Sequence, residues 1–475
     1  MNNEIKAGLE IHQQLDTNKL FCDCPSLLRS DDPSFKISRK LHAVAGEGGE
    51  IDIAARYEVE KDKRFTYHGY DTTCLVELDE EPPHLINKEA LRIGLHISLL
   101  LNCEILPLSQ IMRKTVVDGS NTSGFQRTVL IARNGWIKTS KGKVSIDNVN
   151  LEEDSARIVG NDGGDKVFRL DRLGIPLIEI GTGPDIKSSE QAKEAALILG
   201  DILRSCKVRR GIGTIRQDVN VSIEGHPRIE IKGFQDVKMF VPTIEEEVKR
   251  QNRNLKSKKK LESEVRNALS TGKTEFLRPM PGAARMYPET DLPLLRISRE
   301  IINDAKRTLP KLRSEVREEL SKEGLREDEI KVLFKEDKLE EFESLLKILR
   351  DPRFVFKILI EIPRDLSKKS NKSLKDIRKR ISLDVMEKLI SSVVENKFQK
   401  EDITQIIENL VSGKSLEDSM RIEKADLNFV RKEIEKIVKA KPGLSIGGYM
   451  GLVMNKFKGK VSGKDVNEIL NKLLK

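Results

Sequence analysis

Residues 8–15, with the sequence GLEIHQQL, alternate between apolar and polar side chains. Successive side chains of an extended strand point to opposite faces of a sheet. Leu9 and Ile11 therefore share one face, and Glu10 and His12 share the other, which predicts a strand with one buried side. A carboxylate and an imidazole side by side on a strand can form a metal site, an acid–base pair or an ordinary polar surface. The stretch alone leaves these three interpretations open.

The composition predicts an ion-rich protein of several domains. A chain of 475 residues corresponds to roughly two to four domains. The 85 basic and 76 acidic residues give a net charge of +9, which favours polyanionic partners, with nucleic acid first among them. The beginning of the sequence has no signal-peptide pattern, and the longest apolar run is too short to cross a bilayer. We therefore expect a cytoplasmic protein without a membrane segment.

The cysteines are odd in number and scattered along the chain, which argues against a disulfide framework and for a reducing compartment. The pair in FCDC resembles half of a zinc knuckle, but no second close pair follows it. We therefore expect plain buried thiols rather than a structural zinc bound by Cys22, Cys24 and Cys74.

The distribution of residue types predicts three domains. Residues 1–296 contain most of the glycines and the strand-like runs, and we expect an α+β domain with an antiparallel sheet. Residues 297–410 have helical spacing with proline breakers and predict an all-helical domain. Residues 411–475 predict a small helical tail, in which GGYMGLVMNKFKGK brings glycines and lysines to helix ends that can contact phosphate.

Within residues 1–296, helices are expected at about 88–102, 188–206 and 242–270. Strands are expected in KAGLEIHQQL, EIDIAARYEV, TVLIARNGWIKT, KVSIDNVNLEED, PLIEIGTG, GTIRQDVNVSIEG and RIEIKGF. Two fragments, STGKTE and VSGKSLE, end like a phosphate-binding P-loop, but Asn267 and Glu408 stand where that loop needs its first glycine. A P-loop is thereby excluded.

Two further strand-like stretches carry carboxylates. In NVNLEEDSARIV the alternation places Asn150, Glu152 and Asp154 on one face. In GIPLIEIGTG, Glu179 is a lone carboxylate among apolar neighbours, which is costly unless a cation compensates it. The alternative is a glutamate at a strand end that reaches solvent or an arginine.

The stretch TIRQDVNVSIEGHPRIEIKGF predicts a hairpin around EGHP, with one apolar face. Its other face is polar and carries Asp218, Asn220, Ser222, Arg228, Glu230 and Lys232. This face is either a solvated surface or, if other carboxylates converge beside it, a site for metal-bound phosphates. Carboxylates with one imidazole suit Mg²⁺, with Mn²⁺ as the alternative, better than zinc. The residues alone thus predict a metal-dependent, ATP-using, basic enzyme.

Nine stretches, in this order, resemble the E subunit of the archaeal glutamyl-tRNA(Gln) amidotransferases, within the larger family that includes the bacterial-type B subunit. Eight of them lie between residues 8 and 293 and the last in the tail: GLEIHQQLDTNKLFCDCPS, CLVELDEEPPH, DGSNTSGFQRT, NLEEDSARIV, DRLGIPLIEIGTGPDI, IRQDVNVSI, IEIKGFQDV, RPMPGAARMYPETDLP and GGYMGLVMNKFKGKVSGKDVNEILNKLL. GFQRT and DEEPPH are similar to the E type rather than the B type.

The resemblance implies a cradle distantly similar to glutamine synthetase, then a helical domain and a YqeY-like tail that binds tRNA. It implies that His12, Glu152 and Glu179 are the catalytic metal positions, with Glu10 beside them. It allows a further set of residues to line the ATP and acyl site: Arg216, Asp218, Asn220, Ser222, Lys232, Arg285 and Tyr287.

The implied reaction is that of a ligase with two steps. The γ-carboxylate of glutamate on tRNA(Gln) attacks the γ-phosphate of ATP, and ammonia then displaces the phosphate to leave Gln-tRNA(Gln). The chain has no serine or threonine nucleophile motif for releasing ammonia, so the resemblance implies an asparaginase-like D subunit as partner, in a heterodimer or a dimer of heterodimers.

The sequence departs from the E-type pattern at one place. An insertion similar to a domain of bacterial aspartyl-tRNA synthetases is missing before RPMPGAARMYPETD, so the domain plan is that of a B subunit. Two alternatives therefore stay open. One is a B-type subunit that also processes Asp-tRNA(Asn), and the other is a non-catalytic tRNA-binding scaffold.

Overall fold

The computed structural model describes residues 4–43, 45, 49–60, 62–162, 165–234, 236–257, 260–280, 282, 285–421, 426–457, 461 and 463–474. The chain divides into two compact units, Met1–Arg313 and Ser314–Lys475, of which the first is α+β and the second is helical. The domain boundary was expected at 296/297, whereas the first unit continues to Arg313. The first unit is longer because helix α5 (Arg299–Arg307) packs on its helix α2 (Lys88–Leu100).

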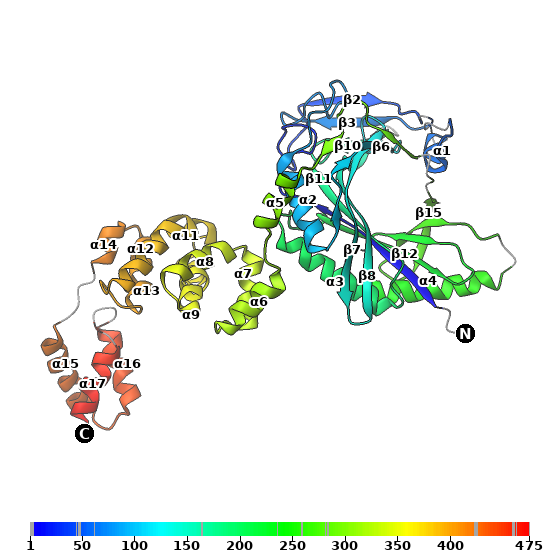
Figure 1. The fold of residues 1–475 in the computed structure, drawn as a ribbon. Coiled ribbons are helices and arrows are strands. Elements are labelled where there is room, and N and C mark those ends of the chain that lie inside the picture. The colour runs from blue at the N-terminus through cyan, green and yellow to red at the C-terminus, as the bar shows by residue number, and fades with distance from the viewer. Residues whose placement is uncertain are drawn as a thin grey trace. The chain divides into compact units, whose positions relative to one another are not determined.

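The first unit is built on an eleven-stranded sheet (Figure 1). From one edge to the other the order is β15 (Thr274–Pro279), β14 (Glu264–Ala268), β13 (Ile229–Lys232), β12 (Ile215–Ile223), β1 (Ile5–Gln14), β11 (Pro176–Thr182), β8 (Gly142–Glu153), β7 (Phe125–Thr139), β6 (Ile111–Thr115) and β16 (Met286–Pro288), with β4 (Glu104–Ile105) also paired to β7. The strands that carry the predicted carboxylates and His12 therefore lie at the middle of the sheet, side by side.

The expectation of an antiparallel sheet was wrong in one respect, because the sheet is mixed. Strands β13 and β14 run parallel, since α4 (Phe240–Leu255) connects them as a crossover. A second sheet of four strands also contains a parallel pair, β3 with β10, in the order β2 (Phe35–Arg39), β3 (Phe65–Gly69), β10 (Asp165–Arg169) and β9 (Arg157–Asp162). A short pair, β5 (Leu108–Ser109) with β17 (Leu295–Arg296), forms a third sheet.

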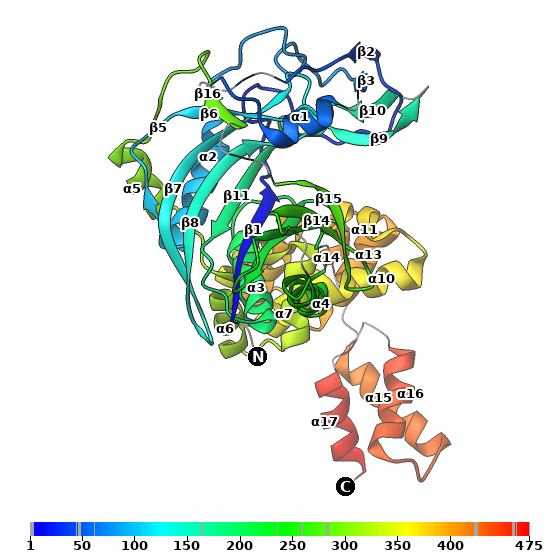
Figure 2. The same ribbon diagram turned by 90° about the vertical axis from the view of Figure 1, so that its right-hand side faces the viewer.

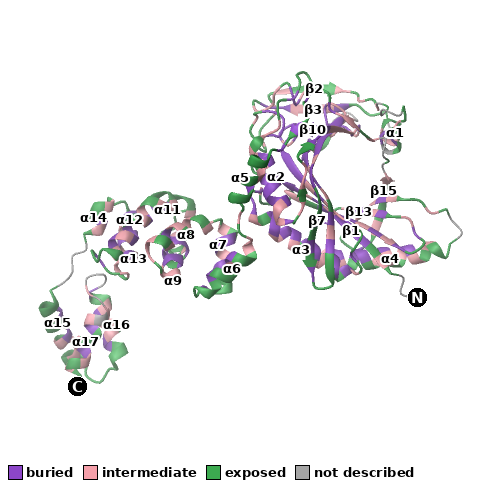
Figure 3. Ribbon diagram, viewed as in Figure 1, coloured by how far each residue is buried: buried purple, intermediate pink, exposed green. Residues whose placement is uncertain are grey.

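Helices cover one face of the large sheet. The apolar residues of β1, including Leu9 and Ile11, lie in one core with residues of α2, α3 (Ser189–Ser205) and α4. Figure 2 shows α3 and α4 on one side of the sheet, and the four-stranded sheet lies on the other side. Most residues of the central strands β1 and β11 and the sheet-facing sides of these helices are buried, whereas the edge strands β15 and β16 are more exposed (Figure 3). The face of β1 that carries Glu10 and His12 is therefore turned away from the helices.

Two helix predictions, for α2 and α3, were confirmed, as was the β12–β13 hairpin. The stretch EIDIAARYEV is not a strand but helix α1 (Ile53–Val59), because Asp52 Oδ1 accepts a hydrogen bond from the Ala55 amide and caps the first turn. The helix expected to reach residue 270 ends at Leu255, and β14 occupies the last part of that range after pairing with β13.

The second unit consists of helices. One core joins residues of α6 to α14, and their bounds are α6 (Arg313–Lys322), α7 (Glu327–Glu336), α8 (Leu339–Ile348), α9 (Pro352–Phe356), a π-helical turn (Lys357–Glu361), α10 (Ile362–Ser370), α11 (Leu374–Arg380), α12 (Leu383–Val394), α13 (Asp402–Ser412) and α14 (Leu416–Met420). A separate small core joins α15 (Leu427–Ala440), α16 (Ile446–Lys456) and α17 (Gly463–Leu473). The expected tail boundary at 410/411 falls inside α13, whose Leu410 and Val411 belong to the larger core.

Among the described residues, no helix combines the length and the apolar character that a membrane crossing needs.

Candidate metal centre

A row of polar side chains crosses four neighbouring strands of the large sheet. His12 on β1 lies opposite Glu179 on β11 and opposite Arg216 on β12. Glu179 in turn lies opposite Asn150 on β8. Side chains at directly opposite positions are close enough to interact. The register therefore brings together residues that are far apart in the sequence.

His12, Glu152 and Glu179 converge, with their ligand atoms all within 4.8 Å of one another. The His12 Nε2 atom lies 3.2 Å from Glu179 Oε2, and Asn150 Nδ2 donates a hydrogen bond of 3.0 Å to the other oxygen of the same carboxylate. Glu152 is almost fully buried, whereas His12 and Glu179 are each 13% exposed, so one side of the group is open to a ligand. The structure thus brings the three predicted residues to one place.

Two residues that the sequence did not single out complete this group. The Lys114 ammonium on β6 forms an ion pair with Glu152 and lies 3.4 Å from Glu179 Oε2. Gln126 on β7 donates a hydrogen bond of 3.1 Å to Glu152 Oε2. Gln126 stands in the GFQRT motif, which was the available signal, but Lys114 lies in IMRKT, where no alternation marks it.

A second acidic group adjoins the first through His12. Glu10, His12 and Asp218 also have ligand atoms within 4.8 Å of one another, and His12 Nε2 lies 3.4 Å from Glu10 Oε1. The Lys232 ammonium donates to Asp218 Oδ2 at 2.5 Å and lies 2.6 Å from Glu230. Lys114 and Lys232 therefore place one ammonium group beside each acidic group.

The acids of the centre differ in their proton affinity. Burial, reinforced by the charge of Glu179, raises the pKa of Glu152, and the same two causes raise the pKa of Glu10. Burial acts on Glu179 as well, but Lys114 and the hydrogen bond with His12 outweigh it and hold the pKa of Glu179 well below its usual range. Glu179 is therefore the acid that stays ionised.

Neighbouring acids raise the pKa of both basic groups of the centre. Burial favours neutral His12, but the hydrogen bond and the charge of Glu179, with those of Glu10 and Glu152, raise its pKa. Burial likewise opposes the Lys114 charge, and Glu152 and Glu179 overcome it, so the pKa of Lys114 is raised. Without a metal ion, the Lys114 ammonium thus balances part of the negative charge of the centre, and the acids favour a proton on His12.

The residues expected to line an ATP and acyl site are only partly at this centre. On the open face of β12, Asn220 and Ser222 follow Asp218 at the next alternate positions, opposite Gly8 and Lys6 of β1. Arg216 reaches sideways instead, and its Nη2 donates to Asp154 Oδ1 at 2.8 Å.

Arg285 and Tyr287 lie at the β16 edge of the sheet. Burial and the neighbouring Arg278 lower the pKa of Arg285, against an attraction to Glu152. Tyr287 stacks edge-on against Phe125, with ring centroids 6.3 Å apart. Arg285 therefore lies within the field of the acids, whereas Tyr287 belongs to an aromatic neighbourhood beside them.

The donor set fits a hard divalent cation. Mg²⁺ holds oxygen ligands in octahedral geometry at about 2.0–2.1 Å, so neighbouring ligand atoms lie about 3 Å apart and opposite ones about 4.2 Å apart. The ligand atoms of His12 and Glu179 are already 3.2 Å apart, and those of all three residues lie within 4.8 Å of one another, so side-chain adjustments can bring them around one ion. Two carboxylates and one imidazole leave room for water and substrate oxygens, which Mg²⁺ and Mn²⁺ both accept.

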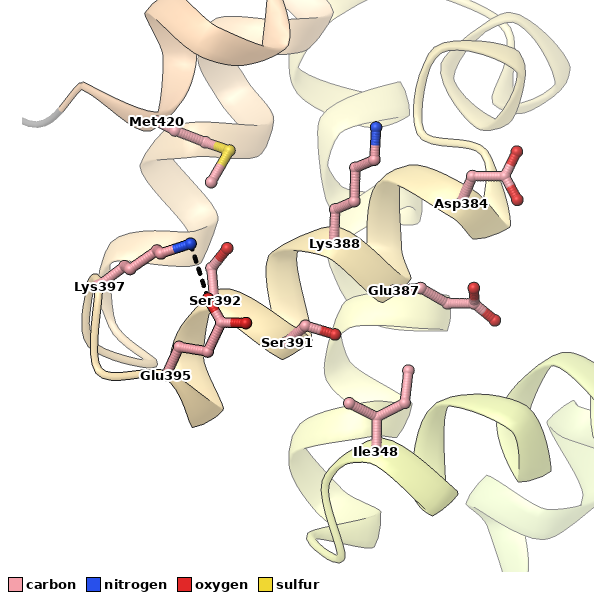
Figure 4. Close-up of a pocket in the computed structure, with 9 residues that line it drawn as sticks. All are labelled: Ile348, Asp384, Glu387, Lys388, Ser391, Ser392, Glu395, Lys397 and Met420. Atoms are coloured by element: carbon pink, nitrogen blue, oxygen red, sulfur yellow. Dashed lines mark ion pairs between the residues drawn. The ribbon is translucent and has the colours of Figure 1, made fainter.

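A pocket in the second unit does not share these features (Figure 4). Residues of α8, α12 and α14 line it, with one ion pair of 2.7 Å between Lys397 and Glu395. Its acids, Asp384, Glu387 and Glu395, do not form a group with ligand atoms facing one another among the described residues. We therefore assign no chemistry to this pocket.

The chain is similar in sequence to a known catalytic domain and to named proteins along nearly its whole length. The family model described as the GatB/GatE catalytic domain matches residues 5–303, which include every residue of the centre. A glutamyl-tRNA(Gln) amidotransferase E subunit from Methanocaldococcus jannaschii is 36% identical over 630 aligned positions, covering 99% of this chain and 98% of the relative. Proteins of the same name from Saccharolobus solfataricus and Pyrobaculum neutrophilum are each 32% identical, again covering 99% and 98%.

The alignment with the Methanocaldococcus jannaschii protein is 630 positions long, whereas this chain has 475 residues, so at least 155 aligned positions have no residue here. The relative is therefore longer than this chain, as expected if this chain lacks an insertion. Both the matched catalytic domain and the coverage of nearly the whole chain lead to one assignment. The chain belongs to the GatB/GatE family, and its relatives are E subunits of glutamyl-tRNA(Gln) amidotransferases.

Proposed function

We propose that this chain converts Glu-tRNA(Gln) to Gln-tRNA(Gln) with ATP and Mg²⁺, as the transamidating subunit of a C–N ligase that serves translation in the cytoplasm. The observation that carries the proposal is the convergence of His12, Glu152 and Glu179 from three strands on the open face of the sheet. Mn²⁺ is the alternative metal. The cradle's likeness to glutamine synthetase and the tail's likeness to YqeY belong to the same proposal.

In the first step, the γ-carboxylate of the tRNA-bound glutamate attacks the γ-phosphorus of ATP, the bond to the β,γ-bridging oxygen breaks, and ADP leaves. Phosphoryl transfer depends mainly on positioning and on neutralising charge. A divalent cation held by His12, Glu152 and Glu179, with Glu10 beside it, supplies that neutralisation when bound. The Lys114 ammonium lies against Glu152 and Glu179. The Lys232 ammonium lies against Asp218 and Glu230, and both ammonium groups can contact phosphate oxygens there.

In the second step, ammonia attacks the acyl carbon of the γ-glutamyl phosphate and inorganic phosphate leaves, with a proton lost from nitrogen. Asp218, Glu230 and Glu10 surround Lys232 and can accept that proton. Arg216, Asn220, Ser222, Arg285 and Tyr287 line the same side of the sheet as contacts for nucleotide and acyl group. We propose that an asparaginase-like D subunit supplies the ammonia.

The test supplies the wild-type chain with Glu-tRNA(Gln), ATP, Mg²⁺ and ammonium salt, and measures Gln-tRNA(Gln) and ADP by chromatography. We expect Gln-tRNA(Gln) to depend on each of the four additions, and ADP to depend on Glu-tRNA(Gln), ATP and Mg²⁺ but not, in the first turnover, on ammonium. Parallel reactions with Asp-tRNA(Asn) test the B-type alternative, which predicts Asn-tRNA(Asn). If neither amidated tRNA forms with or without an asparaginase-like subunit, while tRNA still binds, the chain is a scaffold and the proposal fails.

The tail provides a separate prediction. Helices α15 to α17 have their own core, in which the Tyr449 hydroxyl donates to the Lys441 carbonyl at 2.6 Å, so they can be removed as one piece. Lys458 and Lys460 of the stretch GGYMGLVMNKFKGK lie outside the described residues. Deleting from residue 411 would cut α13, so the cleaner variant ends at Arg421.

We expect the variant that ends at Arg421 to bind tRNA more weakly and with a smaller salt dependence. Each lost phosphate contact lowers the slope of log K against log salt by about 0.7–0.9. Binding titrations at several salt concentrations measure this, and an unchanged thermal unfolding transition of the remaining chain is the control. Equal affinity and equal slope would remove the tail from tRNA binding.

A further inference from the structure

A second cluster of metal-binding side chains lies apart from the acidic centre. Cys22, Cys24, Cys74 and Glu77 have one ligand atom each, and these four atoms all lie within 4.8 Å of one another. The first two cysteines lie in the segment after β1, and the other two residues stand in the turn after β3. The sequence led us to expect plain buried thiols rather than a zinc site of Cys22, Cys24 and Cys74, because no second close cysteine pair follows FCDC.

The backbone around the cluster is fixed by contacts that need no metal ion. The Lys19 amide donates to the Cys24 carbonyl at 3.0 Å, which closes the turn that carries the first two thiols. The Cys74 amide donates to Glu77 Oε2 at 2.9 Å, and the Thr122 hydroxyl donates to the Glu77 carbonyl at 2.6 Å. The four ligand atoms are thus held facing one another by hydrogen bonds of both segments.

A buried lysine balances part of the negative charge of the cluster. Lys19 is almost fully buried, and its ammonium forms an ion pair with Glu77 and donates to the Leu170 carbonyl at 3.2 Å. Partners that hold a ligating carboxylate in place are typical of metal sites. Three thiolates and one carboxylate carry four negative charges, and one buried ammonium balances one of them, so a divalent cation would neutralise two of the remaining three.

We propose that Cys22, Cys24, Cys74 and Glu77 bind one Zn²⁺ ion in a structural, tetrahedral site. Thiolate-rich sets select Zn²⁺ over Mg²⁺, and four protein ligands without an open position are typical of structural zinc. Zn–S bonds are about 2.3 Å long, so the four atoms need to contract by only about 1 Å to enclose the ion. All five cysteines are free thiols, and three thiols in one group leave one unpaired if any two oxidise.

The zinc site would connect chain segments that are far apart in the sequence. It joins the segment after β1, the strand that carries His12, to the turn 74–77 and through Thr122 to the segment that leads into β7. Phe21, next to Cys22, belongs to the main core and lies 6.0 Å from the Arg127 guanidinium. The zinc ion would therefore cross-link segments that flank the acidic centre without taking part in its chemistry.

The test measures metal on the purified full chain by mass spectrometry, after dialysis against metal-free buffer. We expect about one zinc per chain for the wild type and for Cys103→Ser and Cys206→Ser, whose thiols lie outside the cluster. We expect Cys74→Ser, which loses a ligand, to bind zinc at least about 10-fold more weakly in competition with a chromogenic chelator. Wild-type protein without zinc, or equal zinc affinity in Cys74→Ser, overturns the proposal.

A second measurement does not depend on any variant folding. Wild-type chain purified with Co²⁺ in place of zinc should show the ligand-field bands of tetrahedral cobalt and a thiolate-to-cobalt charge-transfer band whose intensity corresponds to three thiolates. Mg²⁺ in excess should leave this spectrum unchanged, since the acidic centre is separate. A spectrum of octahedral cobalt without the charge-transfer band would contradict the site, whatever the outcome of the amidation assay.

Discussion

Replacing Glu179 by glutamine is expected to lower the rate of ATP-dependent amidation by about 10³-fold, which corresponds to about 4 kcal/mol. Glu179 is the acid of the centre whose pKa is held well below its usual range, so it supplies a full negative charge at neutral pH. The glutamine variant keeps the size of the side chain and its hydrogen bond with Asn150, and loses the charge. The change therefore tests the charge rather than the packing.

Formation of Gln-tRNA(Gln) with ammonium as nitrogen source measures the effect, with Mg²⁺ varied over a wide range. The activity remaining in Glu179→Gln should need more Mg²⁺ for half-saturation, because one ligand has been lost. Glu275→Gln is the matched control, since Glu275 is an exposed glutamate on β15 of the same sheet. Wild-type activity and Mg²⁺ dependence in Glu179→Gln would show that the acidic centre is not the metal site.

Alternation along single strands predicted which residues face the open side of the sheet, and the resemblance predicted which of them matter. Alternation marked His12, which stands in the ten-residue strand β1 with one apolar face, whereas Glu179 was marked as a lone carboxylate among the apolar residues of β11. The register that places these two opposite each other joins strands far apart in the sequence, and no local pattern fixes such a pairing.

The features that the sequence did not predict also depend on contacts between distant segments or lack a periodic pattern. Lys114 lies in β6, where Met112, Arg113 and Lys114 are all half-buried, so burial does not alternate and no period marks the strand. Residues 264–268 continue the helix-like composition of the residues before them, which led to the prediction of a helix. They form strand β14 because they pair in parallel with β13, and this long-range pairing overrides the local preference. Cys74 meets Cys22 only through the packing of two turns, where no periodic signal exists.

Replacing Lys114 by methionine is expected to reduce the turnover number for amidation by about 10²–10³-fold, the usual effect of losing one preorganised charge at a phosphoryl-transfer site. The ammonium lies against Glu152 and Glu179, the same carboxylates that would hold the divalent cation. With a divalent cation held by those carboxylates, the Lys114 ammonium would be repelled from them and could donate to a phosphate oxygen instead. Lys114 would thus neutralise the acids before Mg²⁺ enters and the γ-phosphate afterwards.

This double role predicts opposite changes in two measured quantities. Without the competing ammonium, Lys114→Met should bind Mg²⁺ more tightly, so half-saturation shifts to lower Mg²⁺ while the turnover number falls. Lys138→Met, an exposed lysine on β7, is the matched control and should change neither. A lysine that only held the two strands together would, when replaced, weaken Mg²⁺ binding along with turnover. A fall in both quantities would therefore reject the phosphate-binding role and leave Lys114 as a structural counter-ion.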